Sequence, residues 1–236
     1  MNDSDTSFTG ERFVPGRSGS RIEKDHLSRY LFSTKYAAGV SVLDIACGSG
    51  YGAPYFLRAG ALDYTGVDIS PQSVDYARAN YRAEKVTFLQ GDVCNFSAQK
   101  KYGLITCFET IEHVLCYRKA VAHLRDALVV GGTLIISSPN RPVTTVGAQS
   151  VADKPNNPFH TQEFTASELC GLLVESGFSV ADGDVYGQRL RPAAIQRVFS
   201  VLRIPDIFAF LSSSGVSKYD IQQVPRYFLI VARKSS

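Results

Sequence analysis

Two carboxylates and a histidine stand close together just after the apolar run Leu104–Phe108. Glu109, Glu112 and His113 have the spacing i, i+3 and i+4. If the helix predicted over Ile111–Leu128 begins here, all three side chains project from one helix face. A histidine with an ordinary pKa near ~6.5 can accept a proton at neutral pH, so His113 is a candidate general base. Alternatively, the two acids complement the dipole of the first helical turn and the histidine is structural.

A second pattern joins an apolar strand to a glycine-rich turn. The run Val42–Gly52 reads VLDIACGSGYG, and glycine lets a ligand approach the backbone more closely than a Cβ atom allows. Asp44 precedes the glycines, and Asp68 ends the next strand, eighteen residues beyond Gly50. A carboxylate at that strand end can accept both hydroxyls of an adenosine ribose, and Asp92 after the third strand can reach an adenine amino group. The pattern predicts a site for a cofactor that contains adenosine.

Strand-like apolar runs alternate with helical patterns, and these elements must position both groups of residues. The alternation is typical of a parallel sheet with crossover helices, in which ligands bind at the carboxyl ends of the strands. We expect an α/β fold, a Rossmann-like three-layer sandwich with a seven-stranded, mostly parallel sheet and an antiparallel last strand. The expected strands are Ser41–Ala46, Tyr64–Asp68, Val86–Gly91, Leu104–Phe108, Gly132–Ser138, Ser179–Tyr186 and Arg226–Arg233. The expected helices are Ala53–Ala59, Pro71–Tyr81, Ile111–Leu128 and Ala166–Glu175.

A length of 236 residues favours one large domain with an insertion over two full domains. Within the single domain 1–236 we expect an N-terminal cap or lid (1–40) and a core that binds the cofactor (41–186). An insertion or lid (187–225) and the last strand (226–236) complete it.

Two segments lie outside the expected core. The first, Ile22–Ala38, has the pattern of an amphipathic helix in front of the first strand. The second, Gln188–Val224, is too long for a tight turn, and we expect a lid, an interface of a homodimer or an ordinary pair of packed helices. Its apolar residues at helical spacing are Ile195, Val198, Phe199, Leu202, Ile207, Phe208, Phe210 and Leu211.

The composition excludes several classes of protein. Hydrophobic residues make up 44% and charged residues 20% of the chain, which excludes disordered, collagen-like and coiled-coil chains. A net charge of +3 does not call for a nucleic-acid or anionic-membrane partner, and no run approaches the ~20 apolar residues of a membrane span. We therefore expect a cytoplasmic protein. The cysteines are odd in number and form no CxxC pair, which predicts buried thiols without a disulfide framework or a zinc site: Cys47, Cys94, Cys107, Cys116 and Cys170.

The order and spacing of these motifs over about residues 41–140 resemble class I S-adenosylmethionine-dependent methyltransferases. The resemblance rests on Asp44–Gly52, Gly66–Ser70, Gly91–Asp92 and the strand Tyr102–Phe108. It implies that the methionine part of the cofactor lies at Gly48 and Gly50 with Asp44 near its ammonium group, and that Asp68 binds the ribose. It further implies that Ile69 packs on adenine, that Asp92 binds its amino group, and that Ala46, Val93 and Phe108 complete the site. Ala46 stands where the family often has a glycine.

The segment Glu109–His113 resembles the ExxEH motif of ubiquinone-pathway O-methyltransferases and of the small-RNA 3′-terminal 2′-O-methyltransferase. In those families the two acids, the histidine and a downstream histidine hold a divalent metal. Here His160, within Asn157–Phe164, is the matching downstream histidine. The resemblance adds a third interpretation of Glu109, Glu112, His113 and His160, in which a metal such as Mg²⁺ assists deprotonation of the acceptor.

The N-terminal residues Thr9–Pro15 and Ile22–Tyr30 resemble methyltransferases that accompany bacterial glycosyltransferases. This resemblance favours a small-molecule acceptor, a sugar or glycoside hydroxyl. We therefore expect methyl transfer from S-adenosylmethionine to a hydroxyl group. The alternatives are an N-methyltransferase of amino sugars, an RNA 2′-O-methyltransferase, which the missing basic patch disfavours, and a non-catalytic cofactor-binding protein.

Overall fold

The computed structural model describes residues 20–202, 213–220 and 222–236, and it confirms the Rossmann-like α/β fold. The strand order is β3-β2-β1-β4-β5-β8, and β6 and β7 both pair with the outer edge of β8, so eight segments fill seven positions. Pairs among β1 to β5 are parallel, whereas β8 is antiparallel to β5, as predicted. The strands are β1 (Ser41–Ile45), β2 (Asp63–Asp68), β3 (Val86–Gln90), β4 (Tyr102–Cys107), β5 (Leu128–Pro139), β6 (Phe178–Ser179), β7 (Val185–Pro192) and β8 (Gln223–Lys234).

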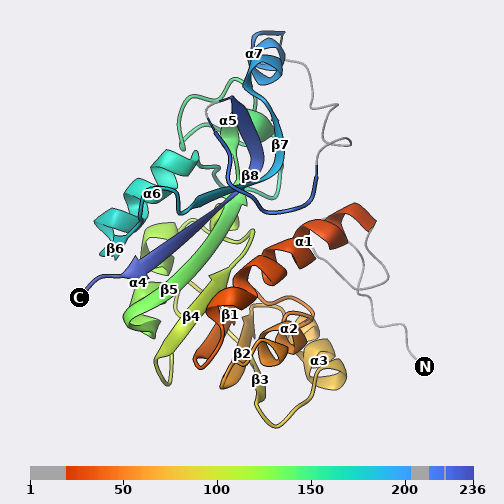
Figure 1. Cartoon of the computed structure of the whole chain (residues 1–236), viewed down its shortest axis with the longest axis vertical. Helices are drawn as coiled ribbons and strands as arrows, with labels where there is room; N and C mark the ends of the chain where they lie inside the picture. Colours follow the sequence, from red (N-terminus) through yellow and green to blue (C-terminus); the bar gives the residue numbers. More distant parts are fainter. Residues whose placement is uncertain (1–19, 203–212, 221) are drawn as a thin grey trace.

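Helices cover both faces of the sheet (Figure 1). One apolar core lies between the sheet and α4 and α6, and the other lies between the sheet and α1, α2 and α3. These two cores give the three-layer sandwich its thickness. The helical segments are α1 (Ser20–Ser33), η1 (Thr34–Tyr36), α2 (Ala53–Arg58), α3 (Pro71–Asn80), η2 (Ile111–His113), α4 (Tyr117–Ala127), α5 (Arg141–Thr144), α6 (Ala166–Glu175) and α7 (Ala193–Leu202).

The single helix predicted over Ile111–Leu128 is wrong. A 3₁₀ turn, η2, is followed by extended backbone at Val114, and α4 begins only at Tyr117. The carbonyl groups that would continue the helix are bonded elsewhere, because Gln162 Nε2 donates to the carbonyl oxygens of Ile111 (2.6 Å) and Val114 (3.0 Å). Partners fifty residues away therefore break a helix that the local pattern favours.

Three further predicted boundaries change in the structure. The strand predicted over Ser179–Tyr186 is two strands, β6 and β7, separated by a turn in which Gly183 adopts a φ of 84°. The N-terminal helix, predicted to reach Ala38, ends at Ser33, and the 3₁₀ turn η1 follows it. The strand β7 and the helix α7 occupy the first part of the segment expected as an insertion, so Val185–Pro192 belongs to the sheet.

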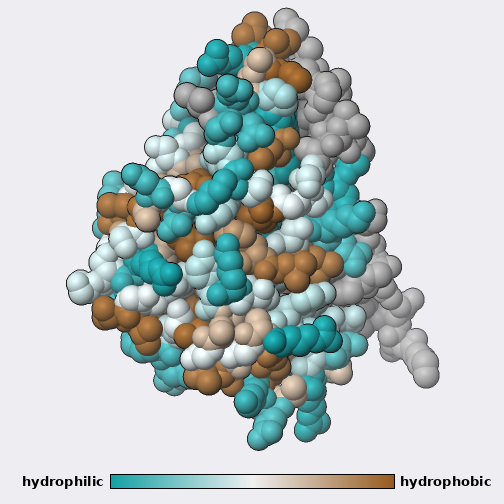
Figure 2. Space-filling view, in the orientation of Figure 1, coloured by the Kyte–Doolittle hydropathy of each residue, from teal (hydrophilic) through white to brown (hydrophobic). Residues whose placement is uncertain are grey.

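Some predicted features lie outside the described residues. They are the N-terminal motif Thr9–Pro15 and the apolar residues Ile207, Phe208, Phe210 and Leu211. On the face shown in Figure 2, exposed hydrophobic side chains are interspersed with hydrophilic ones. Single exposed apolar residues are normal on protein surfaces and do not by themselves mark a functional site.

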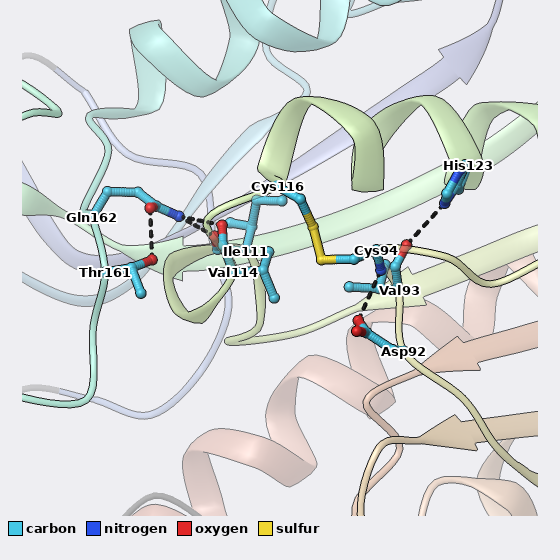
Figure 3. Close-up of a disulfide and its surroundings, with 9 residues drawn as sticks. All are labelled: Asp92, Val93, Cys94, Ile111, Val114, Cys116, His123, Thr161 and Gln162. Atoms are coloured by element: carbon cyan, nitrogen blue, oxygen red, sulfur yellow. Dashed lines mark hydrogen bonds between the residues drawn. A yellow bond between two sulfur atoms is a disulfide. The ribbon is translucent and has the colours of Figure 1, made fainter.

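The expectation that no disulfide forms is also wrong. Cys94, after β3, and Cys116, before α4, are joined by a disulfide with Cα atoms 5.9 Å apart (Figure 3). Cys47 and Cys107 are buried free thiols, as predicted, and Cys170 is a partly buried one. The bond ties the loop that carries Asp92 to the segment that follows His113.

Reducing this disulfide is expected to lower the free energy of unfolding. The cysteines are 22 residues apart, and cross-linking a loop of that length stabilises a fold by about 3 kcal/mol in the chain-entropy view. The double variant Cys94→Ser/Cys116→Ser should melt lower than the wild type and no longer respond to dithiothreitol, while Cys170→Ser should respond as the wild type does. Equal melting temperatures of the wild type with and without reductant would contradict this expectation.

Candidate active site

The first cavity lies at the carboxyl ends of β1 to β4, against α1, and has a volume of about 370 Å³. The glycine-rich turn after β1, the residues after β2 and β3, and the segment after β4 form its walls. Of the nine predicted cofactor residues, Asp44 and Gly50 do not line it. The other seven do: Ala46, Gly48, Asp68, Ile69, Asp92, Val93 and Phe108.

Asp68 is fixed at the end of β2 by two backbone donors. Its Oδ2 atom accepts a hydrogen bond from the Gly48 amide (2.9 Å), and Oδ1 accepts one from the Ser70 amide (2.9 Å). The carboxylate therefore ties the glycine-rich turn to β2 while it faces the cavity. Beside it, the apolar side chain of Ile69 is 62% exposed and lines the cavity.

Small residues are required at Gly48 and Gly50 of the glycine-rich turn for two different reasons. Ala46 and Gly48 both adopt left-handed backbone, with φ of 56° and 55°, and a Cβ atom on Gly48 would meet nothing within 4 Å. A Cβ atom on Gly50, by contrast, would lie 2.6 Å from the Cβ of Ala77 and 2.7 Å from the ring of Phe88. Gly48 thus keeps the cavity open, whereas Gly50 lets α3 pack closely against the turn.

Asp44 lies behind the cavity wall and not in it. Its carboxylate is buried and accepts hydrogen bonds from three hydroxyl groups, those of Tyr30 (2.8 Å), Tyr64 (2.6 Å) and Thr106 (2.7 Å). Burial raises the pKa of Asp44 to about 6, although the three hydrogen bonds act in the opposite direction. Only Tyr30 connects this carboxylate to the cavity, because it is the one of the three donors that lines it.

The helix α1 supplies cavity residues that belong to the N-terminal motif Ile22–Tyr30 but to which the sequence patterns assigned no role in the site. Tyr30 and His26 line the first cavity, together with Tyr51 from the glycine-rich turn. The ring of Tyr30 makes edge contacts with Tyr51, Phe56 and Phe108, at centroid distances of 5.1, 5.8 and 5.3 Å. The aromatic spacing in α1 is the signal that could have identified these residues.

The second cavity has a volume of about 350 Å³ and adjoins the first. Among the described residues, His26, Glu109 and His113 line both cavities and therefore mark the junction between them. The other walls come from α1, the segment after β5, and the start of β8. They include Asp25, Arg29, Glu112, Thr144, Asn156, Asn157, His160, Glu163, Arg226 and Tyr227.

Three of the four predicted metal ligands meet in the second cavity. One ligand atom from each of Glu112, His113 and His160 lies within 4.8 Å of the other two. Glu112 is fully buried, and neither of its carboxylate oxygens has a hydrogen-bond partner. Burial, followed by repulsion from Glu109, raises the pKa of Glu112 well above its ordinary value. A buried carboxylate without a hydrogen-bond partner, close to two imidazoles, fits a cation.

Glu109 lies outside this group, so the predicted common helix face is wrong. Its backbone is left-handed, with a φ of 47°. Its Oε1 atom accepts a hydrogen bond from Ser137 Oγ (2.6 Å) and lies 3.8 Å from a guanidinium nitrogen of Arg29. Glu109 therefore stands at the junction of the two cavities, paired with groups from α1 and β5.

Hydrogen bonds hold both histidines of the group in place. His113 Nδ1 lies 2.9 Å from the carbonyl oxygen of Phe159, and His160 Nδ1 lies 2.7 Å from Glu163 Oε1. Burial would raise the pKa of Glu163, but hydrogen bonds from His160, Thr144 and Thr145 outweigh it and lower the pKa. No sequence motif pointed to Glu163, although its i, i+3 spacing from His160 is a signal for such a pair.

A protein-family model described as a methyltransferase domain matches residues 18–182. This match spans the glycine-rich turn, all residues that line the first cavity, most of those that line the second, and the segment that carries His160. The chain belongs to this methyltransferase family. Its methyl donor is S-adenosylmethionine, as in the class I fold that the sheet adopts.

Several similar proteins are also named as methyltransferases. A protein of Mycolicibacterium smegmatis named "Probable S-adenosylmethionine-dependent methyltransferase" is 32% identical, over 74% of this chain and 66% of the relative. A ubiquinone biosynthesis O-methyltransferase of Xanthomonas axonopodis pv. citri is 28% identical, over 65% of this chain and 68% of the relative. The solved structure of the CcbJ methyltransferase from Streptomyces caelestis shares the fold with a TM-score of 0.64 at 14% identity, over 93% and 94% of the two chains.

The methyltransferase has no membrane-spanning helix in its described part. None of the helices found between residues 20 and 236, the undescribed gaps aside, combines the length and the apolar character that crossing a bilayer requires.

Proposed function

We propose that the methyltransferase transfers the methyl group of S-adenosylmethionine to a hydroxyl group of a small molecule, a sugar or glycoside, with the help of a divalent cation. The observation that carries this proposal is the buried carboxylate of Glu112, unpartnered and grouped with His113 and His160 beside the cofactor cavity. A second cavity next to the first supports a catalytic role over a purely cofactor-binding one.

In this proposal the cofactor occupies the first cavity. Asp68 binds the ribose hydroxyls, Ile69 packs on adenine, Asp92 reaches its amino group, and the methionine part lies along Gly48. Asp44 acts through Tyr30, whose hydroxyl it orients, because its own oxygens are already occupied by three donors. This placement directs the methyl group toward the junction with the second cavity.

The acceptor occupies the second cavity, whose lining favours a polyhydroxylated molecule. Amide and hydroxyl side chains of Asn156, Asn157 and Thr144 offer hydrogen bonds, and Tyr227 offers an aromatic face. The relative named for ubiquinone biosynthesis O-methylation supports oxygen as the acceptor atom. The carboxylates that line the cavity would also hold an ammonium group, so an amino sugar is the second candidate.

The donors in the second cavity fit a divalent cation. Glu112, His113 and His160 would hold Mg²⁺, Mn²⁺, Fe²⁺ or Zn²⁺, all of which accept carboxylate and imidazole ligands. Such an ion, when bound, stabilises a developing alkoxide. The chain itself aligns the reactants: the sulfonium is already a good leaving group, so the protein must place the oxygen in line with the breaking bond.

Labelled-methyl transfer followed by mass spectrometry tests the proposal. Candidate nucleotide sugars, free glycosides, amino sugars and quinone precursors are incubated with the full chain and methyl-labelled S-adenosylmethionine. We expect transfer to a sugar hydroxyl, loss of turnover in EDTA, and recovery with an added divalent cation. Binding of S-adenosylhomocysteine should survive EDTA, since its cavity contains only one of the three grouped residues. Full turnover in chelator would contradict the role of the cation in the reaction and leave His113 as the general base.

A further inference from the structure

The disulfide between Cys94 and Cys116 joins two parts of the wall of the first cavity (Figure 3). Cys94 directly follows Asp92 and Val93, both of which line the cavity. Cys116 comes two residues after Val114, which lines the cavity as well. The first part of the wall follows β3 and the second follows β4, so the bond is a covalent cross-link between two separate wall segments.

The backbone of Cys94 orients the cavity residue Asp92. The Cys94 amide donates a hydrogen bond to Asp92 Oδ1 (2.9 Å), and the Asn95 amide donates one to the Asp92 carbonyl oxygen (3.0 Å). His123 Nδ1, from α4, lies 3.1 Å from the carbonyl oxygen of Val93. The disulfide therefore fixes the residue whose amide holds the carboxylate that we propose reaches the adenine.

The wall segment after β4 is held in place independently of the disulfide. Gln162 Nε2 donates to the carbonyl oxygens of Ile111 and Val114, as described above. Thr161 donates to the carbonyl oxygen of Glu112 from its amide (2.8 Å) and from its hydroxyl group (2.9 Å). These bonds persist whether or not the sulfur atoms are linked. Breaking the disulfide therefore loosens the wall segment after β3 more than the one after β4.

Both linked cysteines are partly exposed, whereas the free thiols of Cys47 and Cys107 are buried. Exposed disulfides are the labile ones, because thiol–disulfide exchange needs access to a sulfur atom. A small thiol such as glutathione supplies the reducing equivalents. Its thiolate bonds to one cysteine sulfur, and the other sulfur leaves as a thiolate and takes up a proton. A second thiol then displaces the first cysteine, so that two small thiols become one disulfide and the protein gains two thiols.

We propose that the Cys94–Cys116 bond is a redox switch of donor binding, in which the oxidised protein binds S-adenosylmethionine tightly and the reduced protein binds it weakly. With the bond closed, the wall segment after β3 is ordered before the donor arrives. With the bond open, binding must order that segment, and the lost conformational entropy lowers the affinity. The inference rests on the proposed position of the donor in the first cavity and is independent of the acceptor and the cation.

Calorimetry with S-adenosylhomocysteine on the full chain tests the switch, at a temperature well below the melting temperature of the reduced protein. Reduction with tris(2-carboxyethyl)phosphine should raise the dissociation constant about tenfold. Cys94→Ser/Cys116→Ser should bind as the reduced wild type does, with and without reductant. Cys170→Ser is the matched control and should respond as the wild type does. Equal dissociation constants of the oxidised and reduced wild type would overturn the proposal, even if the melting temperature falls.

Two further measurements separate a switch from a purely structural bond. On reduction, hydrogen exchange should speed up about tenfold in residues 92–95 and stay nearly unchanged in residues 112–114. Mixtures of reduced and oxidised glutathione should open and close the bond reversibly, as measured by maleimide labelling and mass spectrometry, and the affinity should follow the fraction of closed bond. A bond that stays closed in excess reduced glutathione would overturn the switch.

The proposed position of the donor has a separate test. If Asp68→Ala binds S-adenosylhomocysteine as the wild type does, the donor lies outside the first cavity and the basis of the switch is removed with it. If Asp68→Ala weakens binding but reduction of the disulfide does not, the donor position stands and the switch alone is wrong.

Discussion

Replacing Asp68 with alanine is expected to weaken binding of S-adenosylmethionine by roughly 10- to 150-fold. The proposed ribose hydroxyls lose a charged acceptor, a loss of about 1.5–3 kcal/mol. The amides of Gly48 and Ser70, which donate to this carboxylate, lose their acceptor as well, so the turn that shapes the cavity is also loosened. Isothermal calorimetry with S-adenosylhomocysteine measures the change directly.

Asp75→Ala is the matched control for this substitution. Asp75 lies on α3, a few residues beyond Asp68, and is exposed, with Arg78 as an ion-pair partner at 3.5 Å. Its removal should leave the dissociation constant unchanged. Affinity of Asp68→Ala equal to that of the wild type would show that the ribose is bound elsewhere.

The lining of the first cavity was largely predictable because its residues sit at the ends of neighbouring parallel strands. The fold brings together the ends of β1, β2 and β3 whatever the side chains are, so a glycine-rich turn, Asp68 and Asp92 must meet. The role of Asp44 was not predictable in the same way. Its three hydroxyl donors come from α1, β2 and β4, and nothing near Asp44 in the sequence indicates that they converge on it.

The grouping of Glu112, His113 and His160 was predicted from a helix that does not form. The sequence suggested one helix face, but distant partners replace that helix with η2. The Thr161 amide donates to the Glu112 carbonyl oxygen at 2.8 Å, and this bond brings the segment that carries His160 against η2. The group therefore depends on pairing between segments about fifty residues apart. The same kind of long-range proximity joins Cys94 to Cys116, which cysteine spacing alone does not reveal.

Replacing Glu112 with glutamine is expected to stabilise the metal-free protein and to lower turnover by about 1000-fold. Glu112 is fully buried with both oxygens unpartnered, and leaving such a group uncompensated costs about 1–3 kcal/mol, more when it is charged. Its pKa in the folded protein is raised above the ordinary value of 4.5. The protonated form is therefore favoured by the fold, and the free energy of unfolding of the wild type should fall as pH rises from about 4.5 through the raised pKa. Glutamine carries no charge and removes this slope.

Thermal melts of both proteins, with and without divalent cation, separate the two effects. In EDTA at neutral pH, Glu112→Gln should melt about 2–4 °C higher for each kcal/mol gained. Added Mn²⁺ or Mg²⁺ should raise the melting temperature of the wild type and leave the variant unchanged, because only the wild type has the Glu112 carboxylate grouped with the two imidazoles. His160→Ala should also lose turnover and the response to cation. Glu175→Gln is the control, because Glu175 is exposed and paired with Arg118. It should change neither turnover nor the response of the melting temperature to cations. A Glu112→Gln variant that remains active, or that is stabilised by cations as the wild type is, would contradict cation binding by Glu112 in this cavity. The histidines alone would then assist the reaction.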